Sequence, residues 1–338
     1  MNRSGIEWCD HTFNPITGCL TGCPYCYARK MVARFAGDQR FNLSKKDQYR
    51  KEDMLYQKNM SEITSATLYY LDDPFIGENG EKVVYPFGFD PTFHKYRLDT
   101  LDGLKSGCKV FVGAMADIFG PWVPDFWIEM TMKACMDHPN NQYLFLTKWP
   151  KRYEDLIHSG KLPKLDNFWY GTSCTRTSDE FFAKQGYNCW LSVEPILEEF
   201  PEPLEGINRI SWIVMGAETG NRKEKVVPEK RWIDEILQIA DRHKIPVFMK
   251  DSLQPIVNLE NMRKDYPEEM IQKKPGPGWK KLRYAKCLKC GKEYQKGEMA
   301  TIEARWERGS SAQILGHICQ DCFEGWKKEQ GFEVSKDE

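Results

Sequence analysis

The sequence has no excess of charge of either sign and no long apolar run. Its 48 Lys and Arg residues balance 49 Asp and Glu residues, which leaves a formal net charge of −1. This balance excludes strong attraction of the whole chain to nucleic acid or to an anionic membrane, so any such binding needs a local basic patch. A membrane-spanning helix needs about 18 consecutive apolar residues, and the sequence contains no such run. The first 13 residues lack the apolar stretch of a secretory signal peptide, and we therefore expect a soluble cytoplasmic protein.

What the sequence does have is cysteine, with 12 residues of this type in a chain of 338. Disulfide frameworks are typical of small secreted domains and are rare in a reducing compartment. Seven of the cysteines fall into two tight groups, and clustered cysteines of intracellular proteins usually bind metal. The sequence therefore predicts two metal sites, one near each end of the chain.

Six short apolar runs alternate with charged segments of helical composition. Each run is nearly continuous in hydrophobicity, as expected for strands that are buried on both faces. Candidate helices, such as 125–138 and 229–244, lie between them, and one more strand is expected before the first cysteine group. This alternation predicts an α/β fold with a partial or complete parallel (β/α) barrel, and an open doubly wound sheet is the alternative. The six runs are 109–115, 142–147, 167–173, 188–194, 210–216 and 245–250.

Residues 38–100 interrupt this alternation and are predicted to form an insertion. Residues 44–60 have the charged composition of a helix, whereas 66–89 predicts a hairpin that turns near Glu78-Asn79-Gly80. The barrel is expected to span residues 1–255 with this insertion inside it.

The first cysteine group places Cys19, Cys23 and Cys26 in one C-x3-C-x2-C loop. Thiolates hold iron–sulfur clusters, and three protein ligands on a four-iron cluster leave one iron open to an outside molecule. The alternative is a zinc site with these three thiolates and His11 as the fourth ligand. Zinc sites more often show paired C-x2-C motifs, and no second pair lies nearby, so the spacing favours the cluster.

This motif, with an aromatic residue before its last cysteine, resembles that of the radical S-adenosylmethionine (SAM) superfamily. The resemblance implies a partial barrel whose [4Fe–4S] cluster chelates SAM at the open iron. It further implies reductive cleavage of SAM to methionine and a 5′-deoxyadenosyl radical, with an electron donor such as a flavodoxin or ferredoxin. Over roughly residues 5–255 the chain also resembles the phage-associated radical-SAM-like family named after phage Gp37/Gp68 proteins. The segments that carry this likeness are IEWCDHTFNPITGC, VFVGAMADIF, FLTKWPKR, WYGTS, WLSVEPI, WIVMGAETG and PVFMKD.

Polar residues follow the predicted strands, at the rim where parallel barrels assemble their active sites. If SAM lies across these strand ends, its amino group needs acceptors near the end of the second strand. The superfamily has a Gly-Gly-Glu-like stretch there, and GAMAD departs from it, so Asp117 is a substitute and not a motif match. The ribose hydroxyls need polar side chains from the middle strands, where Ser173, Ser192 and Glu194 are suitably placed. The segment IVMGAE resembles the adenine-contacting strand of the superfamily, which points to Gly216 and Glu218.

Three more residues at the predicted rim are candidates for chemistry. Lys148 and Lys250 are suited to hold the SAM carboxylate or a substrate phosphate, and solvated rim charges are the alternative. Cys174 is a candidate hydrogen-atom donor if its thiol faces the barrel mouth, and a buried, inert thiol is the alternative.

The second cysteine group consists of two C-x2-C pairs in a module predicted at residues 285–330, after a basic linker at 256–284. Cys287, Cys290, Cys319 and Cys322 predict a closed tetrahedral zinc site, with 299–306 and 312–319 forming the small sheet of a zinc-ribbon-like domain. The rival occupant is a second iron–sulfur cluster. Basic residues surround Trp279 and Tyr284, a pattern suited to phosphate contact and base stacking or to a solvated linker. They are Lys273, Lys274, Lys280, Lys281, Arg283, Lys286, Lys289 and Lys292.

These features predict a radical SAM enzyme that acts on a nucleotide or nucleic acid. One alternative is a nucleic-acid-binding or regulatory iron–sulfur protein that does not cleave SAM. Another is a radical enzyme that acts on a peptide and uses the zinc module to bind its protein partner. No membrane partner is expected, and the sequence does not define the oligomeric state.

Overall fold

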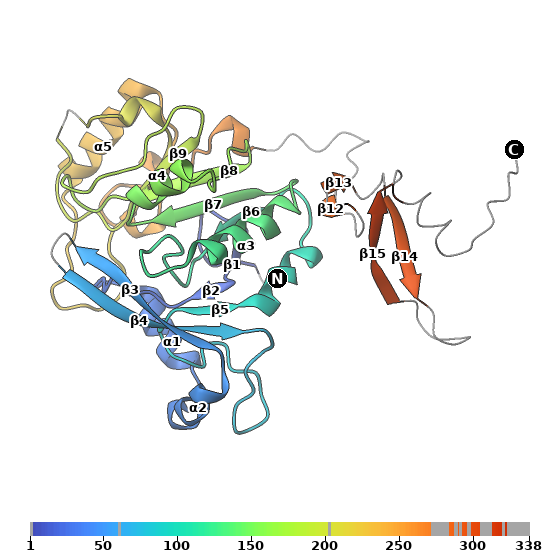
Figure 1. Cartoon of the computed structure of the whole chain (residues 1–338). Helices are drawn as coiled ribbons and strands as arrows, with labels where there is room; N and C mark the ends of the chain where they lie inside the picture. Colours follow the sequence, from blue (N-terminus) through green and yellow to red (C-terminus); the bar gives the residue numbers. More distant parts are fainter. Residues whose placement is uncertain are drawn as a thin grey trace, which may run out of the picture. The chain divides into compact units, whose positions relative to one another are not determined.

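The computed structural model describes residues 3–59, 62–201 and 204–271, together with 284–286, 290, 293–295, 299–304, 313–319 and 322. The chain divides into two compact units, Met1–Lys274 and Pro275–Glu338 (Figure 1). Residues 256–271, predicted as part of a linker, belong to the first unit, where Val257 and Met270 are buried. Among the helices of the described ranges, none is long and apolar enough to cross a membrane.

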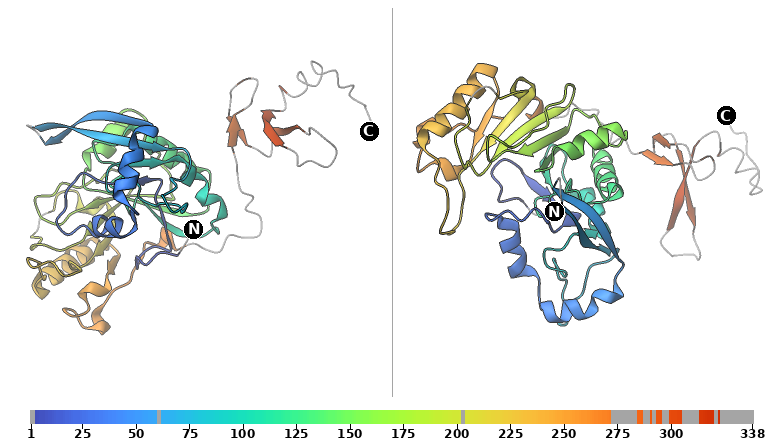
Figure 2. Two further views of the ribbon diagram at one scale, coloured as in Figure 1. Left: turned by 90° about the horizontal axis from the view of Figure 1, so that it is seen from below. Right: turned by 60° about the vertical axis from the view of Figure 1, so that its left-hand side comes forward.

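The first unit is built on a sheet of seven strands that are all parallel (Figures 1 and 2). Each strand after β1 lies beside the next strand of the alternating pattern, so the sheet winds in one direction as an open half-barrel. The predicted α/β fold is therefore confirmed as the partial-barrel form, and the doubly wound alternative is wrong. In spatial order the strands are β1 (His11–Phe13), β6 (Lys109–Val112), β7 (Gln142–Thr147), β8 (Phe168–Ser173), β9 (Asn188–Val193), β10 (Ile210–Met215) and β11 (Val247–Met249).

Helices cover the outer face of this sheet and contribute to its larger apolar core. Their buried residues recur three or four positions apart, as an amphipathic helix requires. In β7, Tyr143 and Phe145 belong to this outer core, whereas Leu144 between them belongs to the inner face. The helices are α3 (Asp125–Met136), α4 (Lys151–His158) and α5 (Lys230–His243).

The inner face of the half-barrel is filled by aromatic side chains. Trp190 lies 5.4 Å from both Trp8 and Trp212, measured between ring centroids. Gly171 permits this packing, because a Cβ at that position would lie 2.2 Å from the Trp190 ring. The inner face is therefore a packed core, which leaves the carboxyl ends of the strands as the place for a site. We call the surface formed by these ends the mouth.

Three strands of the insertion form a second sheet together with β2, which precedes the insertion, in the spatial order β2-β5-β4-β3. The predicted helix at 44–60 is wrong over most of its length, because β3 (Lys51–Asn59) pairs antiparallel with β4 (Glu62–Leu71). The hairpin predicted at 66–89 is wrong in its extent, because β4 pairs with β3. The turn near Gly80 is confirmed, since an antiparallel bridge joins Ile76 to Lys82 and the N–H of Gly77 donates to the carbonyl of Glu81 at 2.8 Å. Both errors have one cause, since cross-strand pairing overrides local composition. The other elements of this region are β2 (Ile16–Thr17), β5 (Thr92–His94), α1 (Tyr27–Phe35) and α2 (Gln39–Lys45).

Within the second unit, two strand pairs are described. β12 (Tyr284–Lys286) pairs antiparallel with β13 (Glu293–Gln295), and β14 (Met299–Ala304) with β15 (Gln313–Cys319). Of the predicted zinc ligands, Cys287 and the side chain of Cys319 lie outside the described residues, as do the side chains of the basic residues predicted to contact phosphate. The four-cysteine site therefore stays a prediction.

Candidate functional site

The cysteine loop, residues 18–26, connects β2 to α1 beside the end of β6. Gly18 begins the loop with φ at 86°, and a Cβ there would lie 2.3 Å from the carbonyl oxygen of Asp90, so only glycine fits. The N–H of Gly18 donates to the carbonyl of Met115 at 3.0 Å. The loop is thereby fixed to the segment that follows β6, at the mouth.

The three thiols of the loop have different surroundings. Cys26 caps α1, since its Sγ accepts the N–H of Arg29 at 3.5 Å, and such a helix N-terminus suits an anionic sulfur ligand. Burial raises the pKa of Cys19 to about 11. Burial also raises the pKa of Cys23, and the positive charge of Lys148 opposes that shift.

The donor type and the location of this loop fit an iron–sulfur cluster held by three thiolates. Cys23 lies within electrostatic range of both Cys26 and Lys148, so thiols and a cation share the mouth. In the ranges that the structure describes, no three His, Cys, Asp or Glu side chains are arranged to hold one metal ion, and this includes His11, the alternative zinc ligand.

A pocket of about 890 Å³ lies directly beside Cys23. One wall is the cysteine loop at residues 21–25, and another is 148–151 after β7. The end of β8 contributes Ser173, the loop after β8 contributes residues between 175 and 180, and the loops after β9 and β10 complete the lining. Lys148 is half-buried there, with its Nζ 5.5 Å from the centroid of the Tyr25 ring. The pocket thus brings together two predicted rim residues, Lys148 and Ser173, with a predicted cluster ligand.

Several charged groups of the pocket are already bound within the protein. The Asp179 carboxylate accepts the N–H groups of Thr175 and Arg176, and Glu198 accepts the N–H and hydroxyl of Thr177. By contrast, no ion pair within the described ranges involves the side chains of Lys151 and Arg176, which also line the pocket. Neither cation was nominated from the sequence, although Lys151 belongs to the segment FLTKWPKR that leads from β7 into α4.

Asp117 is buried beneath this part of the mouth and does not line the pocket. One carboxylate oxygen accepts the hydroxyl of Thr147 at 2.7 Å, and the other accepts the N–H of Lys148 at 2.8 Å. Burial raises the pKa of Asp117. In the structure this residue positions the segment that carries Lys148, and its contact with SAM stays a prediction.

The ends of β9 to β11 are occupied by contacts within the protein. Lys250 forms an ion pair with Glu194 above Gly216. A Cβ on Gly216 would lie 3.2 Å from the Lys250 side chain and 3.4 Å from that of Glu194, so glycine permits this close approach. Ser192, on the strand below, is buried. None of these four residues lines the pocket.

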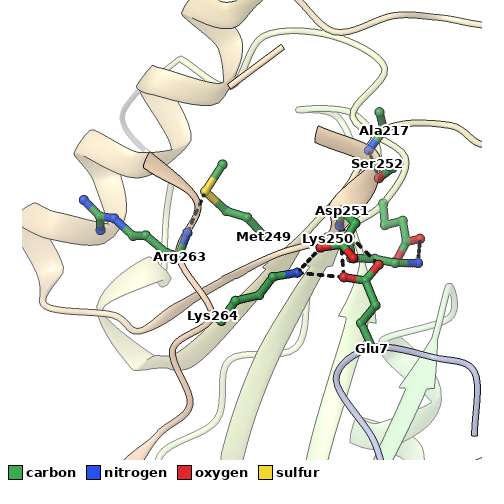
Figure 3. A network of polar contacts seen from close by, with 9 residues as sticks. Glu7, Ala217, Met249, Lys250, Asp251, Ser252, Arg263 and Lys264 are labelled. Carbon is green, nitrogen blue, oxygen red and sulfur yellow. Dashed lines mark hydrogen bonds and ion pairs between the residues drawn. The ribbon is translucent and has the colours of Figure 1, made fainter. Parts of the chain in front are cut away.

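The N-terminal segment completes this network (Figure 3). The Glu7 carboxylate accepts the N–H of Asp251 at 2.9 Å and pairs with Lys264 at 2.7 Å. Lys264 also pairs with the side chain of Asp251 at 2.7 Å. We call the ends of β7 and β8 with their pocket the open half of the mouth, and the ends of β9 to β11 with this network the closed half.

Two further residues predicted for the site, Glu218 and Cys174, are buried within the protein. Glu218 is buried, and its two carboxylate oxygens each accept an N–H of Arg222 at 2.7 Å. Cys174 does not face the mouth: it is 2% exposed in the outer core, near Phe181 and Leu191, and burial raises its pKa to about 12. The prediction that a Cys174 thiol faces the mouth is wrong, because Ser173 takes the inward position and alternate residues of a strand face opposite sides.

The fold and the site define an α/β half-barrel protein whose mouth carries a three-cysteine loop with a pocket beside it. The chain belongs to the family described as "Protein of unknown function (DUF5131)", whose model matches residues 3–270. The matched range lies within the first unit, so the C-terminal cysteine module is outside it. No curated protein and no solved structure matches the chain.

Proposed function

We propose that this protein is a radical SAM enzyme that binds a [4Fe–4S] cluster through Cys19, Cys23 and Cys26. One observation carries the proposal: the three-cysteine loop lies at the mouth of a parallel half-barrel, directly beside a pocket of about 890 Å³. Such a pocket is within the range that encloses a small ligand, and parallel α/β folds bind ligands at the carboxyl ends of their strands. When bound, the cluster supplies the electron that cleaves SAM to methionine and a 5′-deoxyadenosyl radical.

The residues of the open half supply ligand binding and orientation. Lys148, half-buried beside Cys23, is placed to donate to the carboxylate of SAM. Ser173 presents a hydroxyl to the same pocket and is suited to a ribose contact. Asp117 acts indirectly by holding the Lys148 backbone. Because the inner face is filled by tryptophan rings, the substrate has to approach from the pocket side of the mouth.

The substrate that fits the open half best is a nucleotide or nucleic acid. Lys151 and Arg176 line the pocket and, within the described part of the chain, form no ion pair, so a phosphate group can bind them without displacing a carboxylate. The positive charge is confined to individual side chains, because the same lining also carries Asp179, Glu180, Glu198 and Glu224. A zinc ion at Cys287, Cys290, Cys319 and Cys322 remains part of the proposal, as a structural site of the C-terminal module.

The test is electron paramagnetic resonance of the anaerobically reconstituted protein after reduction with dithionite. We expect a signal from a reduced [4Fe–4S] cluster whose g-values change when SAM is added, because SAM binds the open iron. Cys23→Ala should lose this signal. The matched control Cys174→Ala, which changes a thiol of the outer core, should retain it together with its response to SAM. A cluster signal that is identical with and without SAM would contradict the proposal and favour a structural or redox role in a nucleic-acid-binding protein.

A further inference from the structure

Trp149 follows β7 and lines the pocket of the open half next to Lys148. Its side chain is half-buried, and the covered part packs against the outer core. The part of the ring that lines the pocket is apolar surface in contact with water, and covering such surface with a ligand is favourable. The mechanism proposed above gives this ring no role, although it lies in the same pocket as Cys23.

The position of Trp149 is fixed from two sides. Its backbone N–H donates to the Thr147 hydroxyl at 3.0 Å, and that hydroxyl donates to the buried carboxylate of Asp117 at 2.7 Å. Its ring stands at 89° to the ring of Trp122, with 6.0 Å between the centroids, and Trp122 lies 5.5 Å from the ring of Tyr56 in β3. The insertion therefore supports the pocket through β3. A ring that is held in place before a ligand binds loses little conformational entropy on binding.

The only polar atom of the indole ring is already bound within the protein. The Nε1–H of Trp149 donates to the hydroxyl of Thr21, in the cysteine loop, at 3.4 Å. The ring can therefore offer a ligand its apolar face but no hydrogen bond. Such a face recognises flat aromatic rings by stacking, and it accepts every nucleobase because each base has a π-face.

The groups around Trp149 fit the other parts of a nucleotide. Lys151 lies two residues further along the same segment, and Arg176 belongs to the loop after β8. Both side chains are exposed, and neither forms an ion pair with a residue that the structure describes. Leu197 and Val226, from the loops after β9 and β10, add apolar surface to the same lining. An aromatic ring with cations beside it is the combination that binds single-stranded nucleic acid.

We propose that Trp149 stacks on an unpaired base of the substrate and holds it beside the cysteine loop. This inference rests on the proposed function, and it narrows the substrate to a strand that presents a base with a free face. The bases inside a duplex are covered on both faces by their neighbours, so they cannot stack on Trp149 without leaving the helix. The substrate class is therefore single-stranded nucleic acid.

The test is the dissociation constant of a fluorescently labelled oligothymidylate for the full-length, reconstituted protein, measured by anisotropy at low and at high salt. For Trp149→Leu we expect binding that is weaker by about tenfold or more, and for Trp149→Phe, which retains a ring, a loss of no more than about threefold. The loss in Trp149→Leu should be equal at both salt concentrations, because the phosphate contacts are unchanged. The matched control is Trp232→Leu, which changes a half-buried tryptophan of α5 outside the pocket lining and should bind like the wild type.

Two further probes separate stacking from a structural role of Trp149. An abasic strand of the same length and a blunt duplex offer phosphates without a free base, so the wild type and Trp149→Leu should bind each of them equally. A loss of affinity in Trp149→Leu that is as large with the abasic strand as with oligothymidylate would overturn the inference. Unchanged oligothymidylate affinity in Trp149→Leu, or no binding of oligothymidylate to the wild type, would also overturn it.

The same variant separates this inference from the proposed function. Its dissociation constant for SAM should equal that of the wild type, because the stacked base belongs to the substrate. A loss of SAM affinity with unchanged oligothymidylate binding would assign the ring to the adenine of SAM and overturn the inference, while the proposed function would stand. Base stacking as expected, in a wild-type protein whose cluster signal does not respond to SAM, would overturn the proposed function instead.

Discussion

The two halves of the mouth carry similar residues and use them differently. In the closed half, Lys250 pairs with Glu194, and Lys264 pairs with both Glu7 and Asp251. In the open half, no carboxylate of the described ranges forms an ion pair with Lys148, which faces a pocket together with the cysteine loop. A charged residue at the end of a parallel strand is therefore a candidate for ligand binding only when the protein does not itself supply its counter-charge.

The site residues predicted from the sequence fall into both halves of the mouth. Ser173 and Lys148 line the pocket, whereas Glu194, Ser192 and Gly216 lie in the closed half. The contacts of the closed half also fix the N-terminal segment, because Glu7 accepts the N–H of Asp251 at the end of β11. The open half can then remain accessible while the half-barrel stays rigid.

The largest effect, on stability, is expected at the ion pair of Glu218 and Arg222. Arg222 lines the pocket, but its charge is paired within the protein, as the charges of the closed half are. Arg222→Met removes the ion-pair partner of the buried Glu218 carboxylate and should lower the free energy of unfolding at pH 7. Hydrogen bonds from Arg222 lower the pKa of Glu218 in the folded protein. The stabilisation is therefore complete above the unfolded pKa of about 4.3 and is lost as the pH falls through the lower folded pKa.

Chemical denaturation of the wild type and of Arg222→Met at pH 7 and near pH 4 measures this difference. The gap between the two proteins should shrink at the lower pH, because the carboxyl group of the variant becomes protonated and no longer needs a cation. An equal gap at both pH values would show that Arg222 stabilises the fold through packing and not through its charge.

The next effect compares two lysines on neighbouring parts of the mouth. Lys148→Met removes a charged donor from the open half and should raise the dissociation constant of SAM about 10- to 100-fold, as expected for one charge-assisted hydrogen bond. Lys250→Met, in the closed half, should change SAM affinity by no more than about threefold and should instead lower stability, because Glu194 loses its partner. The measurement is the dissociation constant of SAM for both variants at equilibrium. Equal losses of affinity would show that the two halves of the mouth do not differ in SAM binding.

The smallest effect is expected for the exposed cations of the pocket. Lys151→Met/Arg176→Met should weaken the binding of a single-stranded oligonucleotide by about tenfold at low salt and reduce its salt dependence. Lys264→Met is the matched control, since it removes an exposed lysine of the closed half whose charge is already paired. Fluorescence anisotropy at several salt concentrations provides the measurement. If the control weakens binding equally, the nucleic acid does not select the open half.

The half-barrel of the first unit could be predicted because each of its strands is marked by an apolar run in the local sequence. Each run from 109–115 to 245–250 contains a strand of the sheet, and their apolar continuity reflects burial on both faces. The insertion could not be predicted in the same way. Its strand β3 is charged and acquires its conformation by pairing with β4, so composition alone favoured a helix at 44–60.

The same distinction between local and long-range contacts explains which site residues could be predicted. Cys23, Lys148 and Ser173 could be nominated from motif spacing and from their position at strand ends, and the structure brings them to one pocket. The face on which Cys174 lies depends on the exact register of β8, and a shift of one residue reverses it. Whether Glu194 is available to a ligand depends on Lys250, which is distant in sequence, so spacing within a motif does not reveal it.

If SAM is cleaved at the open half of the mouth, the protein forms 5′-deoxyadenosine. The reconstituted protein is incubated anaerobically with dithionite and SAM, and 5′-deoxyadenosine is quantified by chromatography for the wild type and for Cys23→Ala. We expect 5′-deoxyadenosine from the wild type and only background from Cys23→Ala. Absence of product from a wild-type protein with an intact cluster, or equal product from both proteins, would contradict SAM cleavage at this site.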